Sequence, residues 1–372
     1  MIIMALDHVR DLLHTTSLTQ DPTDLQTTTP ILFFTRWITY LCAPAFVFLS
    51  GISAYIAYQN RKDHTASKRL LLQRGLWLIL LELVFVNFVL WFDVHFRIIF
   101  LQVIAAIGFG FILLSFLLKI KARWLALIAI IIIAIHQLLA TALISGNNYL
   151  DVITGILFRR SVFVPTPGFM FLVAYPWIPW FGIMLLGFSF GSWFTTNAAT
   201  RRKSLLLAGF TALVIFFVFR IVNGYGDPAP WSGQKNSMYT MLSFINVSKY
   251  PPSLIYIALF TGITLVLLCL FERGRSWLMD VLSVYGKVPM FYYILHLVFI
   301  RIALFVVVFA QGYSMNDLSF APFQFGRAPG SGIGLTGVYI VWLVIVILLY
   351  PLCKWYAGYK ANHREKWWLS YV

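Results

Sequence analysis

Charged side chains are scarce in this chain. Only 11% of its 372 residues are Asp, Glu, Lys or Arg, whereas soluble domains carry about 25%. Hydrophobic residues make up 60% and recur along the whole chain in runs near the ~20 residues that a bilayer-crossing helix needs. The scarcity of charge argues against a soluble protein, and the runs predict an all-α, polytopic bundle of transmembrane helices.

Acidic residues are especially few, with 13 Asp and Glu against 28 Lys and Arg and a formal charge of +15. Such a balance can indicate nucleic-acid binding, but here the basic residues gather in short loops between apolar runs, as the positive-inside rule requires. We therefore expect no nucleic-acid partner. With ten spans, all the basic loops fall on one side, which predicts that they and the C-terminus are cytoplasmic. These loops are 59–74, 119–123, 201–203, 272–275 and 354–366.

Cysteine is rare, and the motifs of several soluble enzyme classes are absent. Cys42, Cys269 and Cys353 lie in or beside apolar runs without metal-ligand spacing, so we interpret them as lipid-facing or core thiols. The chain has no phosphate-binding Gly-rich loop and no G-x-S-x-G elbow. We expect no metal ion.

The apolar runs predict a single integral membrane domain over residues 1–372 with about ten spans. The first apolar run ends at a polar cluster that begins with Asp7, and residues 1–9 as a helix cover only about 14 Å of a ~30 Å hydrocarbon core. We therefore expect the first span to be truncated at its N-terminus. Segments 145–171 and 223–252 are predicted to be long loops. The other spans are predicted at 35–58, 75–91, up to 118, 124–144, 171–194, 205–221, 253–271, 288–310 and 336–350.

Titratable residues cluster directly after the first apolar run. Ionisable residues at the mouth of a membrane helix favour a functional interpretation, the alternative being a solvated helix end with ordinary ion pairs. Asp7 lies three residues before Arg10 and four before Asp11, so these side chains should share a helix face. His8 is suited to moving a proton near neutral pH. It points about 100° away from Asp7 on a helix, so its partner is expected elsewhere, with Asp11 as one candidate.

Further ionisable residues lie inside the predicted spans. Glu82 and Arg301 both fall near mid-membrane, where they either neutralise each other or belong to a functional relay. His296 is either a packing histidine or part of a site. His136 has only apolar neighbours in sequence, and we interpret it as structural.

Several motifs together resemble bacterial membrane proteins related to heparan-alpha-glucosaminide N-acetyltransferase. The resemblance covers nearly the whole chain. The motifs are MALDHVRD at 4–11, TRW at 35–37, APAFVFLSG at 43–51, YPWIPWFG at 175–182, KYPPS at 249–253, GKVPMFYY at 286–293 with His296, and WWLSY at 367–371.

This resemblance implies an integral membrane acyltransferase of the bacterial inner membrane. Such an enzyme moves an acetyl or other acyl group from cytosolic acyl-CoA to a sugar amine or hydroxyl on the non-cytoplasmic side. The active histidine of the lysosomal enzyme falls in what is here the loop before residue 35. This chain has no matching histidine there, and His14 is the nearest. Acyl-CoA would be the donor substrate, and the partners would be membrane lipids and a sugar or glycan acceptor. A homodimer is compatible with the sequence.

The mechanistic hypothesis assigns catalysis to His8, assisted by Asp7 or Asp11. An arginine would orient an anionic acceptor or stabilise oxyanion charge, and aromatic rings would stack on the sugar. The residues expected to bind substrate are Arg10, His14, Arg36, Arg97, Tyr175, Trp177, Trp180 and His296.

Two other functions fit the same pattern. A proton-coupled transporter or a lipid or glycan flippase would use ionisable residues as a relay. An inactive member of the family would lack part of the donor site. The relay residues would be Asp7, Glu82, His296 and Arg301.

Overall fold

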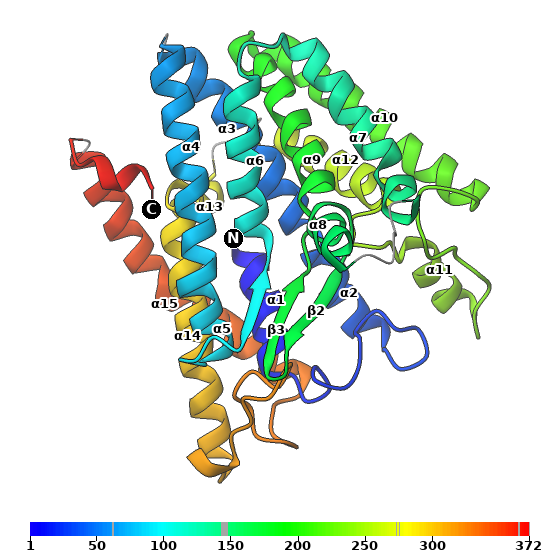
Figure 1. Cartoon of the computed structure of the whole chain (residues 1–372), viewed down its shortest axis with the longest axis vertical. Coiled ribbons are helices and arrows are strands. Elements are labelled where there is room, and N and C mark those ends of the chain that lie inside the picture. Colours follow the sequence, from blue (N-terminus) through cyan, green and yellow to red (C-terminus); the bar gives the residue numbers. More distant parts are fainter. Residues whose placement is uncertain (62, 143–147, 273, 275, 364, 372) are drawn as a thin grey trace. The chain divides into compact units, whose positions relative to one another are not determined.

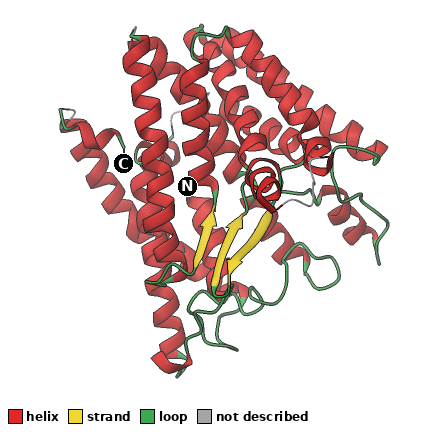
Figure 2. Cartoon of the chain, in the orientation of Figure 1, coloured by secondary structure: helices red, strands yellow, loops and turns green. Residues whose placement is uncertain are grey.

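The computed structural model describes residues 1–372 except 62, 143–147, 273, 275, 364 and 372. The described residues form mainly helices, with one small sheet (Figures 1 and 2), which confirms the predicted all-α, polytopic bundle. Eight helices in this part of the chain are long and apolar enough to cross a membrane. The protein is therefore an integral, multi-pass membrane protein.

The long apolar helices follow the predicted spans. The fourth predicted span corresponds to a shorter apolar helix, α6 (Val103–Leu117). The first predicted span corresponds to α1 (Ile2–Leu13). The eight candidates are Pro30–Arg61, His64–Trp91, Ala122–Ala140, Trp177–Thr195, Ala198–Val222, Leu254–Phe271, Pro289–Ala310 and Leu335–Asn362.

The chain divides into two compact units. Unit 1 comprises Met1–Cys42, Phe85–Phe96 and Gly274–Val372. Within it, α1 packs against α2, α14 and α15. Thr29 caps the N-terminus of α2, because its hydroxyl accepts a hydrogen bond from the Leu32 N–H. Pro30 follows as the first residue of the helix, and its fixed φ suits a first helical turn. The helices of unit 1 are α1, α2 (Pro30–Thr39), α5 (Asn87–Trp91), α13 (Trp277–Lys287), α14 (Pro289–Ala310) and α15 (Leu335–Asn362), with the short η3 (Met315–Asp317) and η4 (Trp367–Ser370).

Unit 2 comprises Ala43–Val84 and Arg97–Arg273. Its main helix pairs are α4 with α6, α7 with α9, and α10 with α12. Gly75 of α4 and Gly108 of α6 let two backbones meet, since a Cβ on either would lie 2.5–2.6 Å from the other's carbonyl oxygen. The helices are α3 (Cys42–Arg61), α4 (His64–Leu81), the π-helix η1 (Glu82–Val86), α6, α7 (Ala122–Ala142), α8 (Asn148–Phe158), α9 (Trp177–Phe190), η2 (Gly191–Thr195), α10 (Ala198–Val222), α11 (Ser237–Ile245) and α12 (Leu254–Phe271).

A small sheet in unit 2 corrects the sequence prediction. The segment predicted as a loop at 145–171 contains α8 and two strands, β2 (Ser161–Thr166) and β3 (Phe169–Val173), although 145–147 lie outside the described residues. β3 pairs antiparallel with β2 and parallel with β1 (Ile98–Leu101), as Figure 2 shows. Gly168, with φ of +86°, forms the hairpin turn.

Candidate functional site

The polar cluster of α1 forms an ion-pair network with α2. Oδ1 of Asp7 accepts hydrogen bonds from Arg10 (2.7 Å), from Arg36 of α2 (2.6 Å) and from the hydroxyl of Thr39 (2.8 Å). Arg10 also donates to Asp11 at 2.5 Å, and Nη1 of Arg36 lies 3.7 Å from the second oxygen of Asp11. Because Arg10 binds both carboxylates, the predicted shared face of Asp7, Arg10 and Asp11 is confirmed.

The network is balanced in charge and largely buried, with Asp11 at its exposed edge. Arg10 is only 2% exposed, and Asp7 and Arg36 are each 12% exposed at the side chain. Two guanidinium groups face two carboxylates, so each buried charge has an opposite charge within hydrogen-bonding distance. This balance offsets the large desolvation cost of burying ions. Nε of Arg10, also buried, has no hydrogen-bond partner among the described residues.

His8 faces a different helix from its neighbour Asp7. Its ring contacts that of His296 on α14, with ring centroids 5.2 Å apart at an interplanar angle of 65°. His296 is fully buried, and its Nδ1–H donates to the carbonyl of Tyr292 at 3.1 Å. The Tyr292 ring stacks on His296 at 8°. Asp7 and His8 are adjacent on α1 but contact different residues: Asp7 binds arginines, and His8 contacts a histidine.

His14 caps the C-terminal end of α1 and lies near Arg327. Its Nδ1 lies 3.1 Å from the Thr16 hydroxyl, and Arg327 donates to its backbone carbonyl at 2.7 Å. Burial lowers the pKa of His14, and the positive charges of Arg10 and Arg327 lower it further. Arg327 also donates to the carbonyl of Thr15, so it binds backbone carbonyls directly after the C-terminal end of α1.

The remaining predicted substrate-binding residues lie in unit 2. Arg97 is exposed directly before β1, and its carbonyl accepts the N–H of Met170. Tyr175 and Trp180 are buried against each other, with ring centroids 4.8 Å apart, and the Tyr175 ring also contacts Tyr250. This packing gives both rings a structural role, and their stacking on a sugar stays a prediction.

Two mid-membrane charges, Glu82 and Arg301, cap helices within their own units, where the sequence had left open that they neutralise each other or belong to a relay. The Glu82 carboxylate accepts the backbone N–H groups of Gln102 and Ala105 at the start of α6. Arg301 donates to the carbonyls of Val89, Leu90 and Phe325, the first two at the end of α5. A carboxylate at a helix N-terminus and a cation at a C-terminus are both favourable with the helix dipole, so the caps account for both charges.

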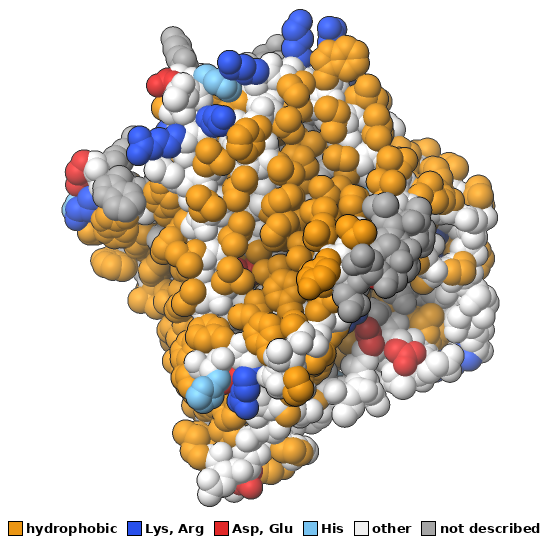
Figure 3. Space-filling model, in the orientation of Figure 1, with side chains coloured by type: hydrophobic (Ala, Val, Ile, Leu, Met, Phe, Trp, Pro, Cys, Tyr) orange, Lys and Arg blue, Asp and Glu red, His pale blue; other side chains and the backbone are white. Residues whose placement is uncertain are grey.

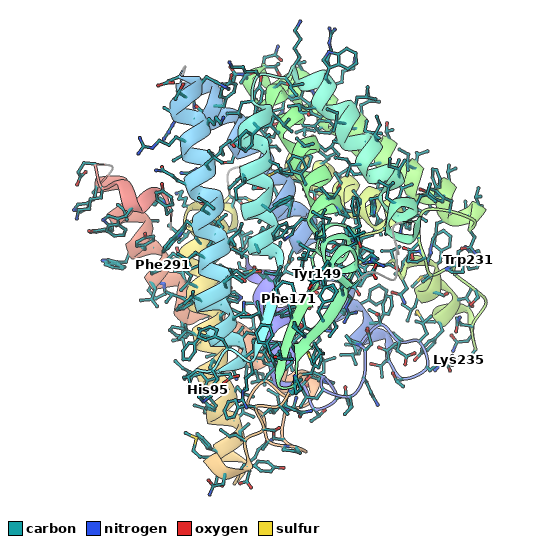
Figure 4. The ribbon with its side chains drawn as sticks, in the orientation of Figure 1. His95, Tyr149, Phe171, Trp231, Lys235 and Phe291 are labelled. Atoms are coloured by element: carbon teal, nitrogen blue, oxygen red, sulfur yellow. The ribbon has the colours of Figure 1, made fainter. Side chains whose placement is uncertain are left out.

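Two further buried polar residues in unit 2 bind backbone carbonyls. Arg220, near the end of α10, donates to carbonyls at the end of α11, including those of Ser243 (2.7 Å) and Phe244 (2.6 Å). Trp231, labelled beside α11 in Figure 4, donates its indole N–H to the Arg220 carbonyl at 2.7 Å. Nε2 of His136 lies 2.9 Å from the carbonyl oxygen of Pro252. These contacts agree with the structural interpretation of His136.

Sequence reasoning did not identify Thr39 or Arg327 as neighbours of the cluster. Thr39 follows Arg36 by three residues, so helical spacing carried a signal for it. Arg327 lies more than three hundred residues from α1, and nothing local in the sequence indicates its contact. In the described ranges, no group of three or more His, Cys, Asp or Glu side chains could hold a metal ion.

A comparison with protein families identifies the class. The family described as "Heparan-alpha-glucosaminide N-acetyltransferase, catalytic" matches residues 1–220, more than half of the chain, including the cluster on α1. The chain belongs to this family, whose name is that of an acetyltransferase. Searches of curated proteins and of solved structures found no match.

Proposed function

We propose that this protein is a membrane acyltransferase that moves an acetyl group from acyl-CoA to a sugar amine or hydroxyl on the opposite side of the membrane. The observation that carries the proposal is the position of His8 inside the region matching the acetyltransferase family, on a helix with a buried ion-pair network. A titratable side chain in such surroundings needs a reason to be there, and proton transfer supplies one.

In this proposal, His8 is the general base. It removes a proton from the acceptor N–H or O–H while the acceptor atom forms a bond to the acetyl carbon. The C–S bond of the thioester breaks, and the thiolate of CoA takes the proton from the His8 imidazolium. The unpartnered Nε–H of Arg10 is a donor for the oxyanion that develops on the acetyl oxygen.

Asp7 and Asp11 act indirectly in this proposal. Both carboxylates bind arginines, so their role is to hold Arg10 and Arg36 in fixed positions. Arg36 would orient an anionic acceptor. Arg97 and His14 are substrate contacts proposed on their position in the sequence alone.

For the donor, we propose that the phosphates of acyl-CoA meet basic side chains on the cytoplasmic side of a bacterial inner membrane. Arg201 and Arg202 form ion pairs with Glu272, which neutralises part of their positive charge. Other Lys and Arg side chains near the ends of α3, α4, α6 and α7 are exposed, and Figure 3 shows basic side chains at the upper ends of α4 and α6. Exposed cations are available to phosphates: Arg61, Arg69, Lys119, Lys121 and Arg123.

The test is acetyl-CoA binding and slow thioester hydrolysis by the purified protein in detergent. We expect saturable binding in the wild type and in His8→Ala, with turnover only in the wild type. His95→Ala, at an exposed position, is the matched control. Absence of binding would contradict the proposal and favour a transporter, although the caps at Glu82 and Arg301 already explain two of the four residues of that relay.

A further inference from the structure

Nε2 of His296 is a buried polar atom without a partner. The imidazole is 0% exposed, and no described residue forms a hydrogen bond with Nε2. Its Nδ1 faces the carbonyl of Tyr292, and a carbonyl can only accept, so the ring proton belongs on Nδ1. Nε2 therefore carries a lone pair. A buried acceptor without a donor is costly and rare, which indicates that a donor reaches it in some functional state.

His8 is the donor that the geometry supplies. Two hydrogen-bonded imidazoles have a nitrogen–nitrogen distance of roughly 3 Å, which puts their ring centres about 5 Å apart. The observed separation of the His8 and His296 rings is 5.2 Å, at an angle of 65°. His296 is fixed between its carbonyl partner and the Tyr292 ring, so the half-buried His8 ring is the one that would turn to direct a nitrogen at Nε2.

We infer that His296 is the positioning residue for His8: its Nε2 accepts a hydrogen bond from one ring nitrogen of His8 and leaves the other nitrogen unprotonated. Which nitrogen of a histidine bears the proton is set by the bond that the other one makes. His296 thus fills the position that a carboxylate fills in a Ser-His-Asp triad. Asp7 is committed to Arg10, Arg36 and Thr39.

This inference rests on the proposed function for its catalytic consequence, but the orientation of His8 can be measured without turnover. A positioned imidazole with one unprotonated, electron-rich nitrogen reacts with diethyl pyrocarbonate, and mass spectrometry of the peptide that contains His8 gives the rate. Because His296 polarises His8 through the hydrogen bond, removal of Nε2 should slow this reaction.

Three substitutions separate the ring nitrogens. His296→Phe keeps a planar ring against Tyr292 and removes both nitrogens. His296→Gln places an amide oxygen near the position of Nε2, whereas His296→Asn reaches only the position of Nδ1. We expect modification of His8 and acetyl transfer to fall about 10- to 100-fold in the Phe and Asn variants and to stay near wild type in Gln. Tyr292→Phe, which removes a buried hydroxyl next to the same imidazole, is the matched control and should change neither rate.

A double-variant cycle distinguishes positioning from packing. In a His8→Ala background, His296→Phe should cause no further loss of acetyl transfer, because the two residues act as one unit. The inference is overturned if the folded His296→Phe variant shows an unchanged rate of His8 modification. It is also overturned if His296→Phe still lowers acetyl transfer in the His8→Ala background. If the wild type transfers no acetyl group, the proposed function fails, and the rate of His8 modification still decides whether His296 orients His8.

Discussion

Nη1 of Arg36 lies 2.6 Å from Oδ1 of Asp7, and this ion pair joins α2 to α1. Both side chains are largely buried, and the same oxygen also binds Arg10 and Thr39. One carboxylate oxygen thus holds the beginning of unit 1 together. The position of His8, the next residue along the chain, depends on this attachment.

Replacing Asp7 should therefore destabilise the protein before any effect on chemistry is considered. Asp7→Asn keeps an acceptor oxygen but removes the negative charge that two buried guanidinium groups share, and breaking a buried ion pair in this way costs about 3–5 kcal/mol. Thr39→Val, which removes one neutral donor, should cost about 1 kcal/mol. Thermal unfolding in detergent should give a lower midpoint for Asp7→Asn than for Thr39→Val, and equal midpoints would contradict this prediction.

Arg301 should be required for stability because of its guanidinium geometry. Arg301→Met leaves the carbonyls of Val89, Leu90 and Phe325 without their donor, at a cost on the order of 3 kcal/mol. Arg301→Lys keeps the charge but cannot reach three acceptors with one ammonium group, so it should fall between Met and the wild type. Unfolding midpoints of the three proteins test this, and a Met variant as stable as the wild type would show that the cap contributes nothing.

The contact between α4 and α6 requires glycine. In Gly108→Ala the new Cβ would lie 2.6 Å from the carbonyl oxygen of Gly75, so the helices must separate, at a cost of about 1–3 kcal/mol. Gly358→Ala in α15 is the control: its Cβ would meet nothing within 4 Å, and alanine should stabilise the helix by about 0.5–1 kcal/mol. Opposite shifts in the unfolding midpoint are expected, and a loss in both variants would contradict the close-contact explanation.

Acid should destabilise unit 1 through His14. Burial and the positive charges of Arg10 and Arg327 lower its pKa in the folded state, so the unfolded chain binds the proton more tightly. The contribution of neutral His14 is complete above about pH 6.5, the ordinary histidine pKa, and is lost as the pH falls toward the lower folded value. In His14→Gln, the drop in unfolding midpoint between neutral and mildly acidic pH should be smaller than in the wild type. An identical drop would exclude His14 as a contributor.

Features set by residues close together in the sequence were predictable, and those set by residues far apart in the sequence were not. The long apolar runs specified their helices, and the spacing of Asp7, Arg10 and Asp11 specified their common face, because both are local periodicities. The β2–β3 hairpin had a local signal too, in the β-branched and aromatic run 162–164 and the Pro-Gly turn at 167–168, but the surrounding polarity favoured a loop.

The partners of the ionisable residues were less predictable because they are set by packing between distant segments. His8 meets a histidine almost three hundred residues away. Glu82 and Arg301 satisfy their charges with backbone groups, which carry no residue-specific signal in a sequence. Charge complementarity alone suggested that they pair with each other, and only the geometry of the helix ends shows the caps.

The most direct test of the proposed chemistry is acetyl transfer by the purified protein in lipid vesicles, supplied with acetyl-CoA and an amino sugar. CoA release and acetylated sugar would be measured together for the wild type and for folded His8→Ala. We expect equal amounts of both products from the wild type and a loss of about 100-fold or more in His8→Ala, since general base catalysis contributes at least that factor. Transfer that is undiminished in His8→Ala, or no transfer by the wild type, would contradict it.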